Sequence, residues 1–175
     1  VAYRLVKSGF QIIILEIEQP TMVRRTVSFA QAIYDGEITI EDVRAKLARN
    51  TKDAIDILSN QEIPILIDPE GHCIEELKPL AVVDVILAKK NMGTHRRMAP
   101  IVIGAGPGFK AGEDVDAVIE TMRGHFLGKV IIEGEAIPNT GTPGDIGGYT
   151  LERVLRSPAH GTFKAIKSIG DIVQK

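Results

Sequence analysis

The residues whose types and spacing most clearly suggest a ligand-binding site are the glycines of IVIGAGPGFKAG, positions 101–112, which predict a turn. Gly104 and Gly106 occupy the first two positions of the G-x-G-x-x-G dinucleotide fingerprint, where glycine permits a tight turn and close backbone approach to a pyrophosphate. Phe109 stands at the third position, directly after Gly108. Three interpretations follow: a dinucleotide site, a turn that lets another ligand or chain segment approach the backbone, and a purely structural turn.

The residues after this turn bear on the choice. Val115, Val118, Ile119 and Met122 have helical spacing, which predicts a helix that ends at Gly124. The acids at positions 113 and 114 suit the start of such a helix, but they would repel a phosphate bound there. These two acids therefore argue against a dinucleotide site at this turn.

Charged residues elsewhere also suggest ligand contacts. Glu16 lies where a Rossmann strand presents the acid that binds a ribose, and Arg24 and Arg25 suit a phosphate. Lys89 and Lys90 follow an expected buried strand at its carboxyl end, the edge where open α/β sheets bind ligands. Each residue is equally explained as ordinary solvent-exposed charge.

Two further segments hold reactive or polar groups. Residues 134–150 form a long loop in which Asn139 and Thr140 stand on a glycine-rich frame, as in a lid, a phosphate nest or a plain connector. Cys73, next to His72, would carry sulfur or selenium if its thiolate were accessible, or would be a small buried apolar residue. The sequence shows no catalytic triad and no spacing typical of a metal site.

The elements that must position these residues alternate between helices and apolar strands. Helices are predicted at 1–8, 21–35, 39–47, 51–58 and 115–122, and strands at 11–18, 62–67, 81–90, 100–103 and 129–133. Apolar strands that alternate with helices favour an α/β fold: a Rossmann-like, mainly parallel sheet with helices on both faces. The last residues alternate as in a β-hairpin, so we expect one domain at 1–150 and a fragment of a small β module at 151–175.

The start of the chain reads as the second half of a βαβ unit. A helix end, Gly9, a buried strand and an acid follow one another, without the strand and glycine turn that would precede them. We therefore expect residues to be missing at both ends.

Composition limits the classes of function. The chain has 175 residues, of which 44% are hydrophobic, and a formal net charge of −2, so no strong field favours nucleic acid or a membrane surface. No apolar run approaches the roughly 18–20 residues that cross a bilayer. A single cysteine excludes an internal disulfide framework. We expect a cytoplasmic protein, with homo-oligomerisation left open.

Several blocks together resemble the selenium-dependent molybdenum hydroxylase accessory proteins of the YqeB type. They are VRRTVSFAQAIYDGE, LAKKN, VIGAGPGFKAGEDVDAVIETMRGH, PNTGTPGDIGGYTLERVLRSPAHG and FKAIKSIGD, which span nearly the whole chain. The resemblance implies a Rossmann-like first part and a role in maturing the hydroxylase or its molybdopterin cofactor. Separately, SPAHGTFKAIKSIGDIVQK resembles the opening hairpin of a biotinyl/lipoyl-type barrel-sandwich module, without its attachment lysine motif.

The expected function is thus that of an accessory factor with a molybdenum hydroxylase as partner and a nucleotide or molybdopterin-type ligand. The expected ligand contacts are Gly104, Gly106, Gly108, Glu16, Arg24, Arg25, Lys89, Asn139 and Thr140. Two alternatives stay open. One is an NAD(P)-dependent oxidoreductase, although no residue is an obvious proton donor, and the other is a non-catalytic scaffold that docks the hydroxylase.

Overall fold

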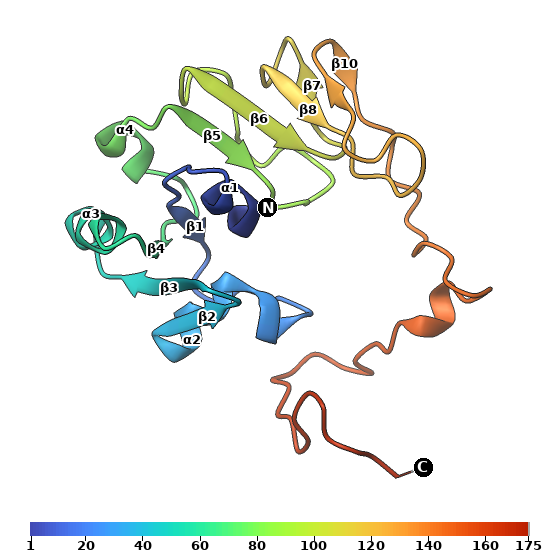
Figure 1. Cartoon of the computed structure of the whole chain (residues 1–175). Helices are drawn as coiled ribbons and strands as arrows, with labels where there is room; N and C mark the ends of the chain where they lie inside the picture. The colour runs from blue at the N-terminus through green and yellow to red at the C-terminus, as the bar shows by residue number, and fades with distance from the viewer. Residues whose placement is uncertain (175) are drawn as a thin grey trace. The chain divides into compact units, whose positions relative to one another are not determined.

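A computed structural model describes residues 1–174, and its internal contacts divide the chain into two units (Figure 1). The first unit is Val1–Pro138, and the second begins at Asn139. The division falls before the boundary expected at residue 150. The first unit is a mixed α/β structure with two four-stranded sheets.

The first sheet has the strand order β1-β4-β3-β2. Its strands are β1 (Ile14–Glu16), β2 (Glu37–Ile40), β3 (Val43–Ala48) and β4 (Ile63–Ile67). Strands β1, β4 and β3 are parallel, while β2 pairs with β3 antiparallel. Helix α3 (Thr51–Ser59) connects β3 to β4, begins at the Asn50 cap and packs on both strands. The predicted helix at 51–58 and the predicted strand at 62–67 are therefore confirmed.

The other helices of this part are short. They are α1 (Ala2–Lys7), the 3-10 turns η1 (Arg25–Val27) and η2 (Phe29–Gln31), α2 (Ala32–Asp35) and α4 (Cys73–Leu77). Helix α1 ends before Gly9, which has φ +90°, as predicted. The continuous helix expected at 21–35 is wrong, because the chain forms separate turns there and Val23 of the expected apolar stripe is 93% exposed.

The helix predicted from Thr39 through Val43 to Leu47 is also wrong. These residues belong to the β2–β3 hairpin, in which Thr39 pairs with Arg44 and Ile40 pairs with Val43. Positions 39, 43 and 47 are four residues apart, a spacing that fits one face of a strand as well as one face of a helix. The hairpin buries Val43 and Ala45 in a core with Ile63 and Ile65.

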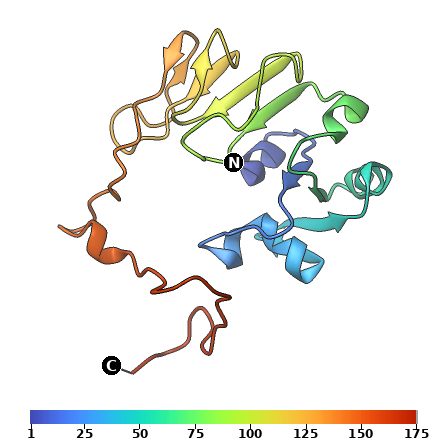
Figure 2. The ribbon, with the colours of Figure 1, turned by 180° about the vertical axis from the view of Figure 1, so that it is seen from behind.

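The second sheet has the order β5-β6-β8-β9, in which β6 lies between β5 and β8 in both views (Figures 1 and 2). Its strands are β5 (Ala81–Asp84), β6 (Ile101–Ala105), β8 (Ala117–Ile119) and β9 (Val130–Ile131). Strands β5, β6 and β8 are parallel and β9 is antiparallel to β8. A separate ribbon pairs β7 (Lys110–Ala111) with β10 (Gly134–Glu135).

The helix predicted at 115–122 is wrong, since this segment contains strand β8. Val115 and Val118 are both fully buried, in a core with Val102 and Phe109. Val115 lies just before the three-residue strand and Val118 lies at its centre, and their i, i+3 spacing was mistaken for helical periodicity.

The second unit contains little regular structure among its described residues. It has one 3-10 turn, η3 (Leu151–Arg153), and an isolated bridge between Ile146 and Tyr149. Residues 154–174 form no strand, so the expected C-terminal hairpin is not confirmed.

Candidate functional site

The carboxyl ends of three parallel strands meet at one edge of the second sheet, where the arrowheads of β5, β6 and β8 point the same way (Figure 1). Asp84 ends β5 and lies opposite Gly104 of β6, and Ala105 lies opposite Ile119 of β8. Open sheets with parallel strands bind ligands outside this edge. The glycine turn at 104–108 therefore stands where a ligand site is expected.

The glycines of this turn are packed against other parts of the chain. A Cβ built on Gly104 would lie 2.5 Å from the ring of Phe109, and one on Gly106 would lie 2.6 Å from the hydroxyl of Thr121. Gly106 also has φ +80°, which L side chains rarely adopt. Both glycines are needed for close packing.

Gly108 brings a second loop to the turn. It has φ +111°, and a Cβ there would lie 2.6 Å from the Cα and 2.7 Å from the backbone nitrogen of Lys90. The backbone at Lys90 thus rests directly on Gly108. The structure brings the glycine turn and the segment that carries Lys89 together at Gly108, and their role in ligand binding stays a prediction.

No helix follows the turn, so the turn differs from a dinucleotide fingerprint. The next element is β7, and the acids predicted to start a helix bind nearby groups instead: Asp114 Oδ2 accepts from the Lys110 N–H at 2.9 Å, and Glu113 pairs with the Lys110 ammonium. A dinucleotide site combines a glycine turn with the N-terminus of the following helix, which binds the phosphate. This edge has the turn but not the helix.

Asp84 holds the two ends of the loop that follows β5. Its side chain is buried; Oδ1 accepts from the Ile86 N–H at 3.0 Å and Oδ2 accepts from the Thr94 hydroxyl at 2.6 Å. Asn91 adds a local turn, because its Oδ1 accepts from the N–H groups of Gly93 and Thr94. Residues 85–94, here named the lysine loop, are therefore closed at their base by a buried carboxylate.

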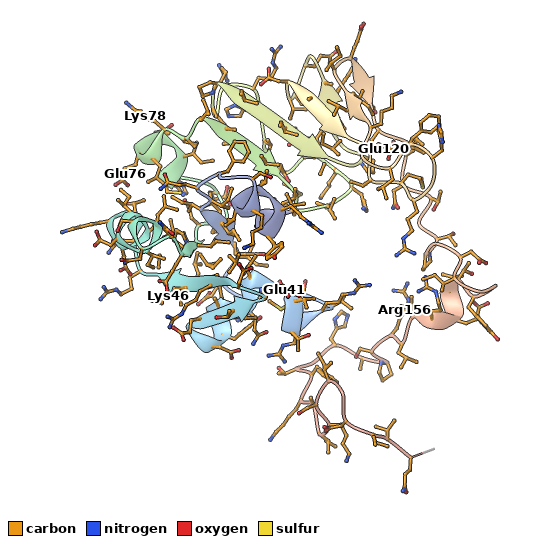
Figure 3. All side chains as sticks on the ribbon, in the orientation of Figure 1. Glu41, Lys46, Glu76, Lys78, Glu120 and Arg156 are labelled. Atoms are coloured by element: carbon orange, nitrogen blue, oxygen red, sulfur yellow. The ribbon has the colours of Figure 1, made fainter. Side chains whose placement is uncertain are left out.

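Glu120 is a second buried carboxylate, directly after β8 (Figure 3). Oε1 accepts from the Met122 N–H at 2.7 Å, and Oε2 accepts from the Ile137 N–H at 2.8 Å. Burial opposes its ionisation, but hydrogen bonds from Ile137, Met122 and Thr121 and the nearby Lys129 charge outweigh burial and lower its pKa. Both oxygens are engaged within the protein, which makes Glu120 a structural anchor.

The other predicted contacts in the first unit belong to the first sheet. Glu16 ends β1, and its Oε2 accepts from the N–H of the following residue. Arg25 donates to Gln31 at 3.0 Å and lies over the Tyr34 ring, while Arg24 precedes η1 with an exposed side chain. The structure thus distributes the predicted set over two sheets, and it commits Arg25 to contacts within the protein.

Asn139 and Thr140 lie in the second unit, where the loop has an internal structure of its own. The Thr142 N–H donates to the Thr140 hydroxyl, and the Gly148 N–H donates to Asp145. Arg153 donates to the carbonyl oxygens of Gly144 at 2.7 Å and Tyr149 at 3.1 Å. Their predicted role in ligand binding stays a prediction.

The environment of Cys73 disagrees with the proposal of a sulfur or selenium carrier. Cys73 is 7% exposed and packs against Ala54 and Ile57. Burial, together with the neighbouring Asp68 carboxylate, raises the pKa of its thiol to about 12. The thiol is therefore protonated at neutral pH, and a carrier needs the thiolate. Asp68 itself caps α4 by accepting from the N–H groups of His72 and Cys73.

The part of the chain that the structure describes contains no group of three or more His, Cys, Asp or Glu side chains placed to hold a metal ion. Within the same residues, every helix is too short or too polar to cross a membrane.

Sequence reasoning missed the residues that organise this edge. Asp84 was visible as an acid inside an apolar strand, which is a signal of a buried hydrogen-bonded carboxylate. Thr94 gave no such signal, because its partner is set by the path of the chain. Gly108 was predicted as a ligand contact, but its packing against Lys90 was not predicted. The role of Glu120 was hidden by the prediction of a helix at its position.

Comparison with known proteins adds one relative. The chain is 51% identical, over all 175 of its residues, to "Uncharacterized protein YqeB" of Escherichia coli (strain K12). It spans about a third (32%) of the length of that curated relative. No family model matches the chain. No solved structure matches it either. The chain is therefore similar, along its whole length, to about a third of that protein.

Proposed function

We propose that this chain is the ligand-binding part of a cytoplasmic accessory factor that matures a selenium-dependent molybdenum hydroxylase. The hydroxylase is its partner, and a nucleotide or molybdopterin-type molecule is its ligand. The sequence resemblance to the accessory proteins supports the role. The identity to the YqeB protein supports the family alone.

The observation that carries the ligand-binding proposal is the convergence at the edge of the second sheet. Three parallel strands end there, and the glycine turn, the lysine loop and Asp84 all belong to that edge. We further propose that the first sheet is Rossmann-like, on the support of its β3–α3–β4 unit and of Glu16 at the end of β1.

The scaffold is the second candidate, and a specific observation favours it. Each of Gly104, Gly106 and Gly108 accommodates a neighbouring part of the same chain, so packing alone explains all three glycines. By contrast, the missing helix after the turn removes the geometry that an NAD(P)-dependent oxidoreductase would use there.

Ligand binding by the full-length protein separates these candidates. Melting temperatures are measured with NAD(P), cytidine nucleotides and molybdopterin species, and each ligand that raises the midpoint is titrated by calorimetry. Lys89→Ala is expected to weaken binding, whereas Lys52→Ala, which removes an exposed charge from α3, is the matched control. Failure of every ligand to bind would refute the binding proposal and leave the scaffold.

The role in maturation needs a separate measurement. In cells that lack the protein, molybdenum hydroxylase activity and its selenium and molybdenum content are expected to fall, and the full-length protein is expected to restore them. Hydroxylase of full activity in those cells would refute the accessory role. The same assay with Cys73→Ser is expected to show unchanged maturation, because the buried thiol is protonated.

A further inference from the structure

Unusual backbone conformations are concentrated in the lysine loop. Among the described residues, the non-glycine positions with positive φ are Glu41, Gln61, Lys78, Leu87 and Lys89. The first three lie in the β2–β3 hairpin or just after α3 and α4, where such angles are common. Leu87 (φ 58°) and Lys89 (φ 66°) lie at no helix end or hairpin turn. Such conformations persist only when surrounding contacts impose them, and they cluster at functional sites.

Two contacts hold the loop, one at its base and one near its middle. Asp84 closes the base through Ile86 and Thr94. The Lys90 backbone lies against Gly108, at a spacing that leaves no room for a side chain. The loop is thus fixed by a buried carboxylate and by close backbone packing against a half-buried glycine.

The charges on this loop have no partner in the described part of the chain. Lys89 and Lys90 are exposed, and neither forms an ion pair with a described residue. The nearest buried carboxylate, Asp84, has both oxygens occupied by hydrogen bonds within the protein. Two consecutive exposed lysines without an ion-pair partner therefore stand on a loop whose backbone is fixed, and such uncompensated positive charge suits an anion.

We infer that the lysine loop is a preformed clamp for the phosphate or diphosphate group of the ligand. Lys89 and Lys90 bind the anion, while Asp84, Thr94 and Gly108 are positioning residues. The inference rests on the proposed function and names the part of the ligand that this edge recognises. The clamp also replaces the helix N-terminus that a glycine fingerprint would provide.

Calorimetry of the full-length protein with inorganic pyrophosphate tests the clamp. Lys89→Ala combined with Lys90→Ala is expected to weaken pyrophosphate binding at least about tenfold and to reduce its dependence on NaCl concentration. A matched glycine pair tests the positioning: Gly108→Ala pushes against Lys90, whereas Gly112→Ala, at φ +90°, meets nothing within 4 Å. Only Gly108→Ala is expected to lose binding.

A pair of substitutions at Thr94, one without and one with the hydroxyl group, keeps the test decisive if Gly108→Ala fails to fold. Thr94→Val removes the bond to Asp84 and is expected to weaken pyrophosphate binding, and Thr94→Ser is expected to restore it. Nucleotide or molybdopterin binding that none of these variants alters would overturn the clamp and leave the proposed function intact. If neither pyrophosphate nor any of those ligands binds, both fail.

Discussion

Glu120 allows a quantitative test of the second sheet. Its carboxylate is 2% exposed and accepts two backbone hydrogen bonds, at 2.7 and 2.8 Å, from Met122 and Ile137. Glu120→Gln preserves the shape of the side chain but replaces one acceptor oxygen with an NH₂ group. One backbone N–H then faces a donor and the other loses its charged partner, so both interactions weaken.

The expected cost follows from these two bonds. A hydrogen bond to a charged group contributes about 1.5–3 kcal/mol, and a buried donor left without a partner costs about 1–3 kcal/mol. We therefore expect Glu120→Gln to reduce the free energy of unfolding by about 2–4 kcal/mol. For a chain of this size, the melting temperature falls by ~4–16 °C.

The pH dependence of this loss has a definite sign. The pKa of Glu120 lies below its ordinary value of 4.5, so its stabilisation is complete above that value and is lost as the pH falls through the lowered pKa. The gap between wild type and Glu120→Gln should be widest near neutral pH and should narrow below pH 4.5. Chemical unfolding followed by circular dichroism from pH 3 to 7 measures it.

A neighbouring acid provides the control for this prediction. Glu113 is exposed and pairs only with Lys110 on the surface, so Glu113→Gln should change stability by less than about 0.5 kcal/mol. A gap for Glu120→Gln that is equally small, or that stays constant across the pH range, would refute the anchoring role.

Three further predictions concern single residues. Cys73 should react with a disulfide reagent at pH 8 at least about a hundredfold more slowly in the folded chain than in denaturant, since its raised pKa leaves little thiolate; fast native reaction would contradict the burial. Arg153→Ala should speed cleavage of the 139–150 loop by a non-specific protease, because two carbonyl contacts are lost, and an unchanged cleavage rate would argue against that role. Glu41 has φ 55° in the two-residue turn of the β2–β3 hairpin (Figure 3). Glu41→Gly should therefore stabilise the chain by about 0.5–1 kcal/mol in thermal unfolding. A loss of stability would show that the turn is not strained.

The parts of the fold that the sequence predicted are those specified by local signals. Gly9 marked the end of α1, and Thr51, which directly follows the Asn50 cap, marked the start of α3. The apolar run at 63–67 is β4, which is buried on both faces as parallel strands are. In these places, local preference and burial agree.

The misassigned segments are those in which spacing is ambiguous. Val115 and Val118 are three residues apart, which fits a helix face, yet Val118 belongs to β8, Val115 precedes it, and both are buried in one core. Ile38 and Ile40 alternate with polar residues, and this two-residue period of β2 was the signal that pointed to a strand. Tertiary pairing with β3 decided the outcome.

The candidate site was predictable only in its parts. Lys89 and the glycines were chosen for their residue types, but their proximity depends on a loop of ten residues that returns to the sheet edge. Short-range sequence patterns do not specify the path of this loop. The path depends on the hydrogen bond between the buried Asp84 and Thr94, which lies ten positions away.

The contact between Gly108 and the Lys90 backbone has an evolutionary consequence. A side chain at position 108 requires the chain to take another course at position 90, so the two positions do not drift independently. A relative that carries a larger residue at the equivalent of Gly108 should therefore also have a lysine loop of different length or sequence. Gly108 thus serves as a one-residue marker for relatives that share this loop.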